Sequence, residues 1–290
     1  MTFPSRRRAI GAAAAFTAAL AGAVAAPATA TAATTGRGRG PKPLRRAHAH
    51  NDYEHDRPLL DALDHGFTSV EADIWLVDGQ LLVAHDEVDL DPARTLESLY
   101  LAPLHRRIRA NGGRVHRGHR GSLQLLVDIK NTGDATYRAL SAELRRHSRI
   151  LTTAARGRVH EGAVTAVISG DRAARVPMEQ EAVRHAFYDG RLEDLGTAAP
   201  ASFIPLISSN WTQSFTWLGT GPMPAAERQL LRDITGAAHA AGQRVRFWAT
   251  PDLAGPERDA VWRELVAADV DHLNTDDLPG LAAFLREFDR

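Results

Sequence analysis

The stretch TSVEADIWL, residues 68–76, is a run of apolar and β-branched residues typical of a buried strand, yet it contains Glu71 and Asp73. Because side chains alternate along a strand, both carboxylates point to the same side. Burying two carboxylates is costly unless they are paired or coordinate a cation. The run therefore predicts a buried strand whose two acids need a compensating positive charge.

Seven other segments also have the composition of short strands, and helical patterns separate them. The full set of predicted strands is 44–50, 68–76, 123–130, 163–170, 185–190, 204–209, 244–250 and 271–276. The predicted helices are 58–66, 136–147, 225–241, 256–268 and 278–288. Residues 79–86, GQLLVAHD, are interpreted as a hairpin return or extended loop after the second strand, so they add no ninth strand.

Eight strands alternating with helices over about 245 residues indicate an α/β fold, a (β/α)8 TIM barrel. An open doubly wound sheet is the alternative, and the absence of a glycine-rich phosphate loop after the first strand argues against it. Active sites of such barrels lie at the carboxyl ends of the strands. The polar residues at those ends are therefore the candidate functional residues.

The amino-terminal segment predicts a leader that precedes this domain. SRRRAIG, residues 5–11, comes before an alanine-rich apolar run and small residues, as in an export signal of the twin-arginine type, residues 1–33, with cleavage near residues 30–33. A membrane anchor is the alternative, but the apolar run is shorter than the ~20 strongly apolar residues of a stable span. Residues 34–43 then form a flexible leader, residues 44–290 the barrel domain, and the mature protein is expected to be secreted.

The composition argues against a nucleic-acid partner and excludes disulfide bonds. After residue 33 the chain has 32 basic and 35 acidic residues, so its charge does not favour nucleic-acid binding. The 290 residues include no cysteine, which removes disulfides as a source of stability.

The predicted strand ends carry an unusual number of polar residues: His48, His50 and Asn51 on the first, Glu71 and Asp73 on the second, Asp128 and Lys130 on the third, and Asn274, Thr275 and Asp276 on the last. Oxygen ligands of this kind suit a hard divalent cation, Ca²⁺ or Mg²⁺. A buried salt-bridge network with arginine is the alternative. His85 follows an apolar run, and a hairpin return would bring it over the same barrel mouth, where two histidines could act as general acid and base.

These motifs resemble those of the phosphatidylinositol-specific phospholipase C and glycerophosphodiester phosphodiesterase superfamily. The matching features are a histidine ending the first strand, Glu71-Ala72-Asp73, His85-Asp86, Asp128-Ile129-Lys130, and the late motifs VRFWAT and HLNTDDLP. The resemblance spans about residues 46–279. HAHNDY, SVEADIWL and SLYLAPL place the chain nearest to a subgroup that includes a fungal protein named for altered inheritance of mitochondria.

The first motif departs from the His-Arg-Gly of glycerophosphodiesterases. His50-Asn51-Asp52-Tyr53 is instead similar to the His-Asn-Thr-Tyr of eukaryotic phospholipase C domains. VHRGHRG, residues 115–121, contains His-Arg-Gly twice but precedes the third strand, so it is interpreted as a basic surface loop.

The resemblance assigns a role to each matching residue. It implies His50 and His85 as catalytic residues, His48, Lys130 and Trp248 as substrate-binding residues, and Asn51, Glu71, Asp73 and Asp128 as ligands of a divalent cation. Two alternatives stay open: Lys130 could simply pair with Asp128, and His48 could replace His50 as the catalyst if the first strand ended two residues earlier. His55 and His65 are expected on helix surfaces.

The function implied is a secreted, metal-dependent phosphoric diester hydrolase that acts on a small-molecule or lipid phosphodiester. A monomer with transient contact to a membrane surface is expected. The alternatives are a sphingomyelinase D-like lyase and a secreted binding module without turnover. Trp211 and Trp217, in the segment 208–221, are expected either to grip a sugar or lipid head group or simply to pack.

Overall fold

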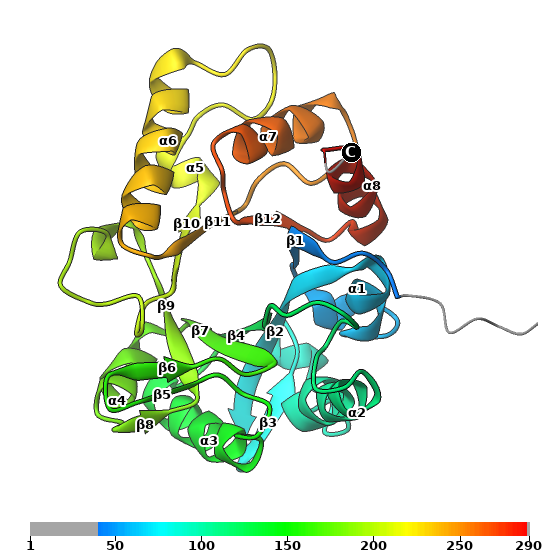
Figure 1. Ribbon diagram of the computed structural model, residues 1–290, viewed down its shortest axis with the longest axis vertical. Helices are drawn as coiled ribbons and strands as arrows, with labels where there is room; N and C mark the ends of the chain where they lie inside the picture. Colours follow the sequence, from blue (N-terminus) through cyan, green and yellow to red (C-terminus); the bar gives the residue numbers. More distant parts are fainter. Residues whose placement is uncertain (1–39, 289–290) are drawn as a thin grey trace, which may run out of the picture. The chain divides into compact units, whose positions relative to one another are not determined.

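Eight parallel strands close into a barrel in the computed structural model of the protein, which describes residues 40–288 (Figure 1). The strands are β1 (Leu44–Ala49), β2 (Phe67–Val77), β4 (Leu123–Ile129), β7 (Val164–Gly170), β9 (Ala186–Gly190), β10 (Leu206–Asn210), β11 (Arg244–Trp248) and β12 (His272–Thr275). β1 pairs in parallel with both β12 and β2, which closes the ring. The predicted TIM barrel is confirmed, and each strand lies within two residues of its predicted ends.

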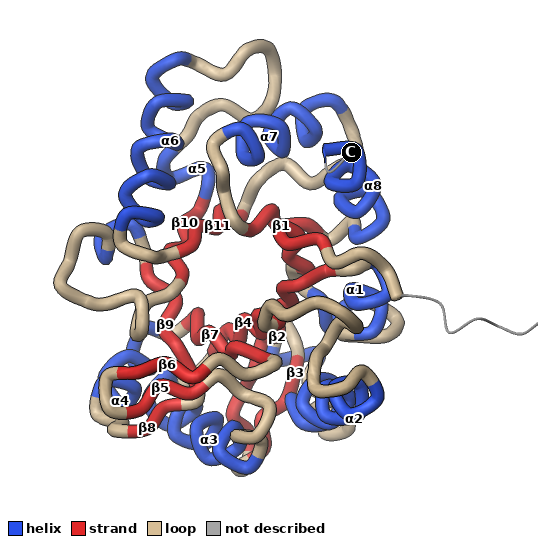
Figure 2. Tube along the Cα trace, in the orientation of Figure 1, coloured by secondary structure: helices blue, strands red, loops and turns tan. Residues whose placement is uncertain are grey.

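Helices surround the ring of strands (Figure 2). They are α1 (Leu60–His65), α2 (Ala102–Ala110), α3 (Gly133–Arg146), α4 (Arg175–Glu179), α5 (Trp211–Ser214), α6 (Ala225–Ala240), α7 (Pro256–Ala267) and α8 (Leu278–Phe288). All five predicted helices are present, whereas α2, α4 and α5 were not predicted. α2 continues a π-helical turn, η3 (Glu97–Leu101), and short 3-10 helices η1 (Asp52–Glu54), η2 (Glu87–Asp89), η4 (Arg172–Ala174) and η5 (Leu192–Asp194) lie in the loops.

Four further strands lie outside the parallel barrel. β3 (Gln80–Val83) runs antiparallel to β2, so residues 79–86 do form a hairpin return. The prediction that they add no ninth strand is wrong, because β3 pairs with β2 at the edge of the same sheet. β5 (Thr153–Ala155), β6 (Arg158–His160) and β8 (Val183–Arg184) form a separate small antiparallel sheet. These three strands are too short to show a sequence periodicity, so the sequence did not predict them.

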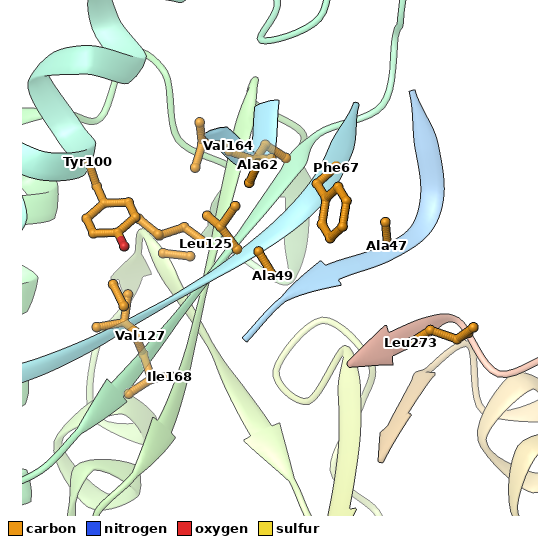
Figure 3. Packing of buried hydrophobic residues seen from close by; sticks show 14 of the residues in the cluster. Ala47, Ala49, Ala62, Phe67, Tyr100, Leu125, Val127, Val164, Ile168 and Leu273 are labelled. Atoms are coloured by element: carbon orange, nitrogen blue, oxygen red, sulfur yellow. The ribbon is translucent and has the colours of Figure 1, made fainter. Parts of the chain in front are cut away.

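The apolar core lies between the barrel strands and the surrounding helices. Side chains at alternating positions of the strands, such as Ala49, Leu125 and Ile168, belong to one large buried cluster (Figure 3). Leu126, Val167, Phe187 and Leu206 form a separate small cluster. Because neighbours on a strand point to opposite faces, this second set faces the barrel interior, which it shares with polar residues.

Gly66 connects α1 to β2, as its position after the predicted helix indicated. It adopts a left-handed conformation with φ of 91°. A Cβ atom at this position would lie 2.5 Å from the carbonyl oxygen of Lys42. The close approach of the two chain segments therefore requires glycine.

The described residues, 40–288, belong to one compact unit. The predicted export signal, residues 1–33, and most of the predicted leader lie outside the described residues. Within residues 40–288, no helix combines the length and apolar character needed to cross a membrane.

Candidate active site

The predicted site residues lie near the carboxyl ends of β1, β2, β4, β11 and β12, at one mouth of the barrel. His50 and Asn51 directly follow β1, while Asp73 on β2 is paired in register with Asp128 on β4. β1 itself pairs with β2 and β12, so closure of the barrel brings together residues more than 200 positions apart in the sequence.

His50 is oriented by an acidic residue from the other end of the chain. Its Nδ1 lies 2.8 Å from Oδ1 of Asp276, and its side chain is 29% exposed. Burial lowers the pKa of His50, but the bond to Asp276 and the charge of Glu71 outweigh that effect, so the net pKa is raised. A positioned, partly exposed imidazole of this kind is suited to proton transfer.

Asp276 is itself held in place by the loop after β11. The two carboxylate oxygens of Asp252 accept hydrogen bonds from the Thr275 hydroxyl, at 2.6 Å, and from the Asp276 backbone N–H, at 2.7 Å. Thr275 and Asp276, at the end of β12, are therefore bound to the loop after β11, and these bonds fix the carboxylate that orients His50.

Glu71 is buried inside the barrel between two nitrogen donors. Its Oε2 accepts hydrogen bonds from Arg246 Nη2 at 2.8 Å and from His48 Nε2 at 3.0 Å. Burial alone would raise the pKa of Glu71, but the charge of Arg246 and the bond from His48 hold it well below its usual range. Glu71 is therefore ionised, and Arg246 supplies the positive charge that its burial requires.

His48 is fully buried and points into the barrel. Its Nδ1 lies 2.7 Å from Ser69 Oγ, so with Glu71 on Nε2 both ring nitrogens are occupied. Burial and the charge of Arg246 lower its pKa to about 4, so His48 is neutral at pH 7. This enclosed position suits a role in holding Glu71 and leaves no exposed His48 surface for a substrate.

Asp73 and Asp128 share one cation from the protein, Lys130. Its Nζ lies 2.8 Å from Asp73 Oδ2 and 3.3 Å from Asp128 Oδ1. Burial, followed by the charges of Glu71 and Asp128, raises the pKa of Asp73 to about 7. Asp73 Oδ1 is buried without a hydrogen-bond partner among the described residues, so this pair of acids is incompletely compensated by Lys130.

Asn51 reaches the same acids through Tyr53, a residue of the His50-Asn51-Asp52-Tyr53 motif to which the sequence assigned no role. The Tyr53 hydroxyl lies 2.8 Å from Asn51 Oδ1 and 2.7 Å from Asp73 Oδ2, and it can donate its one proton to either. Asn51 has φ of 45°, a left-handed conformation that asparagine tolerates better than most residues.

Asp52 is buried, and its carboxylate accepts hydrogen bonds from Leu59 N and the Tyr100 hydroxyl.

His85 follows β3 on the return strand of the hairpin. Val83 pairs with Ile74, so the chain comes back toward the level of Asp73, and Trp75 Nε1 donates a hydrogen bond to the Ala84 carbonyl at 3.0 Å. The His85 side chain is 52% exposed and its Nδ1 lies 3.2 Å from Asp86 Oδ2. It is thus an accessible histidine with an adjacent carboxylate, on the same side of the barrel as Asp73.

The opposite side of the mouth contains a second polar group. Asp189, fully buried, accepts hydrogen bonds from Ser169, Ser208 and Arg191 at 2.6–2.9 Å. The Arg191 guanidinium lies 5.9 Å from the centre of the Trp248 ring, within cation–π range. Trp248 is half-buried and lies at the end of β11.

The two tryptophans of the segment 208–221 pack into the protein instead of facing a ligand. Trp211 is fully buried and stacks on Phe215 with ring centres 4.1 Å apart. Trp217 is 7% exposed and accepts, through its carbonyl, a hydrogen bond from Trp211 Nε1. The packing alternative is therefore correct for both residues, and the head-group role is wrong.

Comparison with known proteins agrees with this geometry. A family model described as the AIM6-like phosphodiesterase domain matches residues 40–189, and one described as the glycerophosphoryl diester phosphodiesterase family matches residues 244–279. The chain belongs to the AIM6-like phosphodiesterase family. This membership supports a phosphodiesterase-type function and confirms the resemblance that the sequence motifs indicated.

Two relatives extend the family assignment over most of this chain, and a solved structure shares its fold. It is 30% identical to Altered inheritance of mitochondria protein 6 of Eremothecium gossypii, over 82% of this chain and 69% of the relative. It is 29% identical to the homolog from Arthroderma benhamiae, over 80% and 81%. A crystal structure of a glycerophosphodiester phosphodiesterase from Parabacteroides distasonis matches 86% of this chain and all of that chain, with a TM-score of 0.51 at 15% identity, which shows the shared fold.

The donors of this AIM6-like site fit a hard cation, although protein cations already occupy part of it. Asn51, Glu71, Asp73 and Asp128 offer oxygen ligands, and the unpartnered Asp73 Oδ1 is a free one. Glu71 is engaged by Arg246, however, so the arginine network considered from the sequence is present as well. The acidic and histidine side chains whose ligand atoms converge within 4.8 Å are elsewhere among the described residues, at Glu97, Glu143 and His147.

Sequence reasoning missed several residues of the AIM6-like site: Tyr53, Asp189, Arg191, Arg246 and Asp252. Arg246 had a usable signal, because an arginine inside the apolar run VRFW needs a buried acid, and Glu71 was already known to need a cation. Asp189, in AFYDG, follows the same logic.

Proposed function

We propose that this protein is a metal-dependent phosphoric diester hydrolase that cleaves a glycerophosphodiester or a phospholipid head group by two-histidine acid–base catalysis. The observation that carries the proposal is the His50–Asp276 pair at the barrel mouth, adjacent to the acids Glu71, Asp73 and Asp128. His50 provides a proton-transfer group, and the acids provide oxygen donors for a divalent cation.

In this proposal Asn51, Glu71, Asp73 and Asp128 would hold a Ca²⁺ or Mg²⁺ ion, which would polarise a phosphoryl oxygen and lower the pKa of a hydroxyl on the substrate alcohol. The residues of the chain do the rest. One histidine of the pair His50 and His85 removes the proton of the attacking hydroxyl, and the other protonates the leaving oxygen. This step breaks the phosphorus–oxygen bond to the leaving group and forms a cyclic phosphodiester, which water then opens with the two histidines in exchanged roles. Asp276 stabilises His50 whenever it carries the additional proton.

Lys130 and Arg191 supply positive charge on the two sides of the mouth. Lys130 forms ion pairs with Asp73 and Asp128. If a divalent cation neutralised those carboxylates, the Lys130 ammonium group would be available to bind phosphoryl oxygens. Trp248, with Arg191 against its ring, would form the wall beside the leaving group. His48 holds Glu71 from inside the barrel.

Export and membrane contact are further parts of the proposal. The twin-arginine pattern of residues 5–11 supports secretion, which fusion of residues 1–43 to a reporter protein would test. Val88 and Leu253, 90% and 91% exposed, lie on the loops after β3 and β11 at the mouth and would touch a lipid surface. Acidic neighbours such as Asp86, Glu87 and Asp252 favour a zwitterionic surface over an anionic one.

The central experiment is a substrate screen of the purified protein with and without a chelator. The panel contains glycerophosphodiesters, phosphatidylinositol and sphingomyelin, and ³¹P NMR identifies cyclic and hydrolysed products. We expect turnover of a glycerophosphodiester or phosphatidylinositol that the chelator abolishes and Ca²⁺ or Mg²⁺ restores. Turnover of sphingomyelin alone would instead identify the lyase alternative, and no turnover of any phosphodiester would favour the binding module.

Two variants connect that activity to the histidines. His50→Ala and His85→Ala should each lower kcat by about 10²–10⁴-fold, the usual contribution of a general acid or base. His160→Ala, an exposed histidine on the separate sheet at β6, serves as the matched control and should retain full activity. Unchanged activity in both site variants would contradict the mechanism.

A further inference from the structure

A large basic cavity lies at the other end of the barrel, where the strands begin. Its volume is about 920 Å³, within the range of small-molecule sites. The starts of β1, β2, β11 and β12 contribute Leu44, Thr68, Arg244 and His272 to its wall, together with residues just before β4. The cavity is therefore separated from the candidate active site by the length of the barrel.

Positive charge dominates the lining of this cavity. It includes Lys42, Arg45, Arg46, Arg120 and Arg244, against Asp269 and Asp271. Arg46 forms an ion pair with Asp269, while Asp271 Oδ2 lies 2.9 Å from His239 Nε2 and accepts a hydrogen bond from the Val245 backbone N–H. Arg45 and Arg120 are exposed, and neither forms an ion pair with another residue of the range 40–288. Arg45 and Arg120 thus bring positive charge to the cavity that no ion pair within residues 40–288 offsets.

Arg244 and His272 form the inner end of the cavity. The Arg244 guanidinium donates a hydrogen bond to His272 Nε2 at 3.0 Å, and His272 is 3% exposed. His272 Nδ1, which carries the proton of the neutral ring, has no hydrogen-bond partner among the described residues. Burial lowers the pKa of Arg244, and burial together with Arg244 holds the pKa of His272 well below its usual range. Asp271 is the acidic neighbour of Arg244, and its charge partly offsets the effect of burial.

The loop VHRGHRG, residues 115–121, forms one lip of this cavity. His116 Nε2 lies 2.8 Å from the Phe67 carbonyl oxygen and attaches the loop to the start of β2. His119, Arg120 and Gly121 line the opening. A Cβ atom on Gly121 would lie 2.6 Å from the His119 ring, so glycine lets that histidine fold across the loop. The motif that resembled a misplaced catalytic signature therefore contributes to a different site.

We propose that this cavity binds a phosphate-bearing small molecule, whose phosphate groups contact Arg45, Arg120 and Arg244. Arginine is suited to this role because its planar guanidinium donates two parallel hydrogen bonds to a phosphate. Pro43, Leu44, Val266, Leu285 and Phe288 provide an apolar part of the wall. That composition matches a phosphate ester with an apolar group more closely than a bare inorganic anion.

The test is calorimetric titration of the whole protein with two probes, pyrophosphate and hexyl phosphate, in buffer freed of divalent metals. At the other mouth, the acidic residues repel phosphate, and the buffer supplies no metal ion that could offset their charge. We expect saturable binding of at least one probe, which weakens as the salt concentration increases. Tighter binding of hexyl phosphate would identify an ester with an apolar part as the ligand, and tighter binding of pyrophosphate an inorganic polyphosphate.

Variants locate the binding at this cavity. Arg45→Gln and Arg120→Gln should each weaken binding by about five- to tenfold, as expected for the loss of a charge-assisted hydrogen bond. Arg117→Gln removes the same charge from an exposed position of the same loop that does not line the cavity, and its affinity should change by less than about twofold. Arg244→Met should abolish binding, and the two surface variants keep the test valid if that variant does not fold.

Two results would overturn the proposal. One is the absence of binding of either probe at millimolar concentration. The other is affinity that is unchanged in Arg45→Gln and Arg120→Gln but lost in Lys130→Gln, because that pattern would place the phosphate at the candidate active site. The first result leaves the phosphodiesterase proposal unchanged, because that proposal rests on residues at the opposite end of the barrel, and the second result would support it while overturning this one.

Discussion

The two faces of the barrel strands differ in chemistry although they alternate along the same residues. Leu125 belongs to the large apolar cluster under the helices, while its neighbour Leu126 faces the interior and is paired in register with Glu71. Outside the ring the packing is mostly apolar, with a few buried polar side chains such as Thr136 and Thr235 on the helices. Inside, Glu71, Asp189 and Arg246 are buried, each with a charged partner. The outer face therefore stabilises the fold, while the inner face positions the reactive groups and depends on charge pairing.

The largest effect should follow from removal of the charge partner inside the barrel. Arg246→Met leaves Glu71 ionised, buried and without its cation, and should lower the free energy of unfolding by about 4 kcal/mol. Urea denaturation at pH 7 measures it. The double variant Glu71→Gln with Arg246→Met should recover much of the loss, since no unpaired charge is left. A loss below about 1 kcal/mol in the single variant would show that the interior does not depend on this pair.

The adjacent leucines distinguish the two faces most directly. Leu125→Ala should lower the free energy of unfolding by about 3 kcal/mol through lost packing and a residual cavity, with kcat of the folded enzyme unchanged. Leu126→Ala removes the same atoms from the inner face, beside Glu71, and should lower kcat as well. Parallel denaturation and activity measurements separate the outcomes. Equal kcat values in the two variants would contradict the division of roles between the faces.

The inner face should also make stability sensitive to acid. The pKa of His48 is about 4 in the folded protein, against 6.5 as its ordinary value, so between these values the unfolded chain binds more protons. Stability is therefore lost as pH falls below 6.5, by about 2 kcal/mol at pH 5 from this residue. Urea denaturation at pH 7, 6 and 5 measures the slope, and His48→Gln should make it shallower. An identical slope in the variant would show that His48 does not titrate in this way.

The smallest change in the free energy of unfolding is expected for a substitution in a loop, which belongs to neither face of the strands. Val88 is 90% exposed, so Val88→Ser should change the free energy of unfolding by less than about 0.5 kcal/mol. If the mouth contacts a lipid surface, the same variant should bind less to phosphatidylcholine vesicles in a sedimentation assay. A large loss of stability would mean that Val88 packs in the folded protein.

The strands and the order of the motifs were predictable because they depend on local composition. The run 68–76 predicted β2 and the side on which Glu71 and Asp73 lie, and the hairpin after it was predicted from position alone. The pairing of Glu71 with Arg246 was not predicted, since the two are 175 residues apart and meet only across the closed barrel. The same holds for His50 and Asp276, which are 226 positions apart.

The sequence also could not show which of two nearby side chains of the same type is accessible at the mouth of the barrel. His48 and His50 lie two residues apart, and the alternation of the strand places both on one face. Only the structure shows that His48 is enclosed between Ser69 and Glu71 while His50 reaches the mouth. Trp211 and Trp217 gave a similar ambiguity, which their burial resolved in favour of packing.

The sequence by itself determined the barrel, the order of its strands and the identity of most polar residues at one mouth, because periodicity and composition act over a few residues. Tertiary structure decided which charges meet, which histidine is accessible and where the surplus of arginine gathers. Those features depend on contacts between segments far apart in the chain, and burial then sets the cost of each charge and the partner it requires. The loop of residues 115–121 shows the difference, because its motif was plain in the sequence and its place at the other end of the barrel was not.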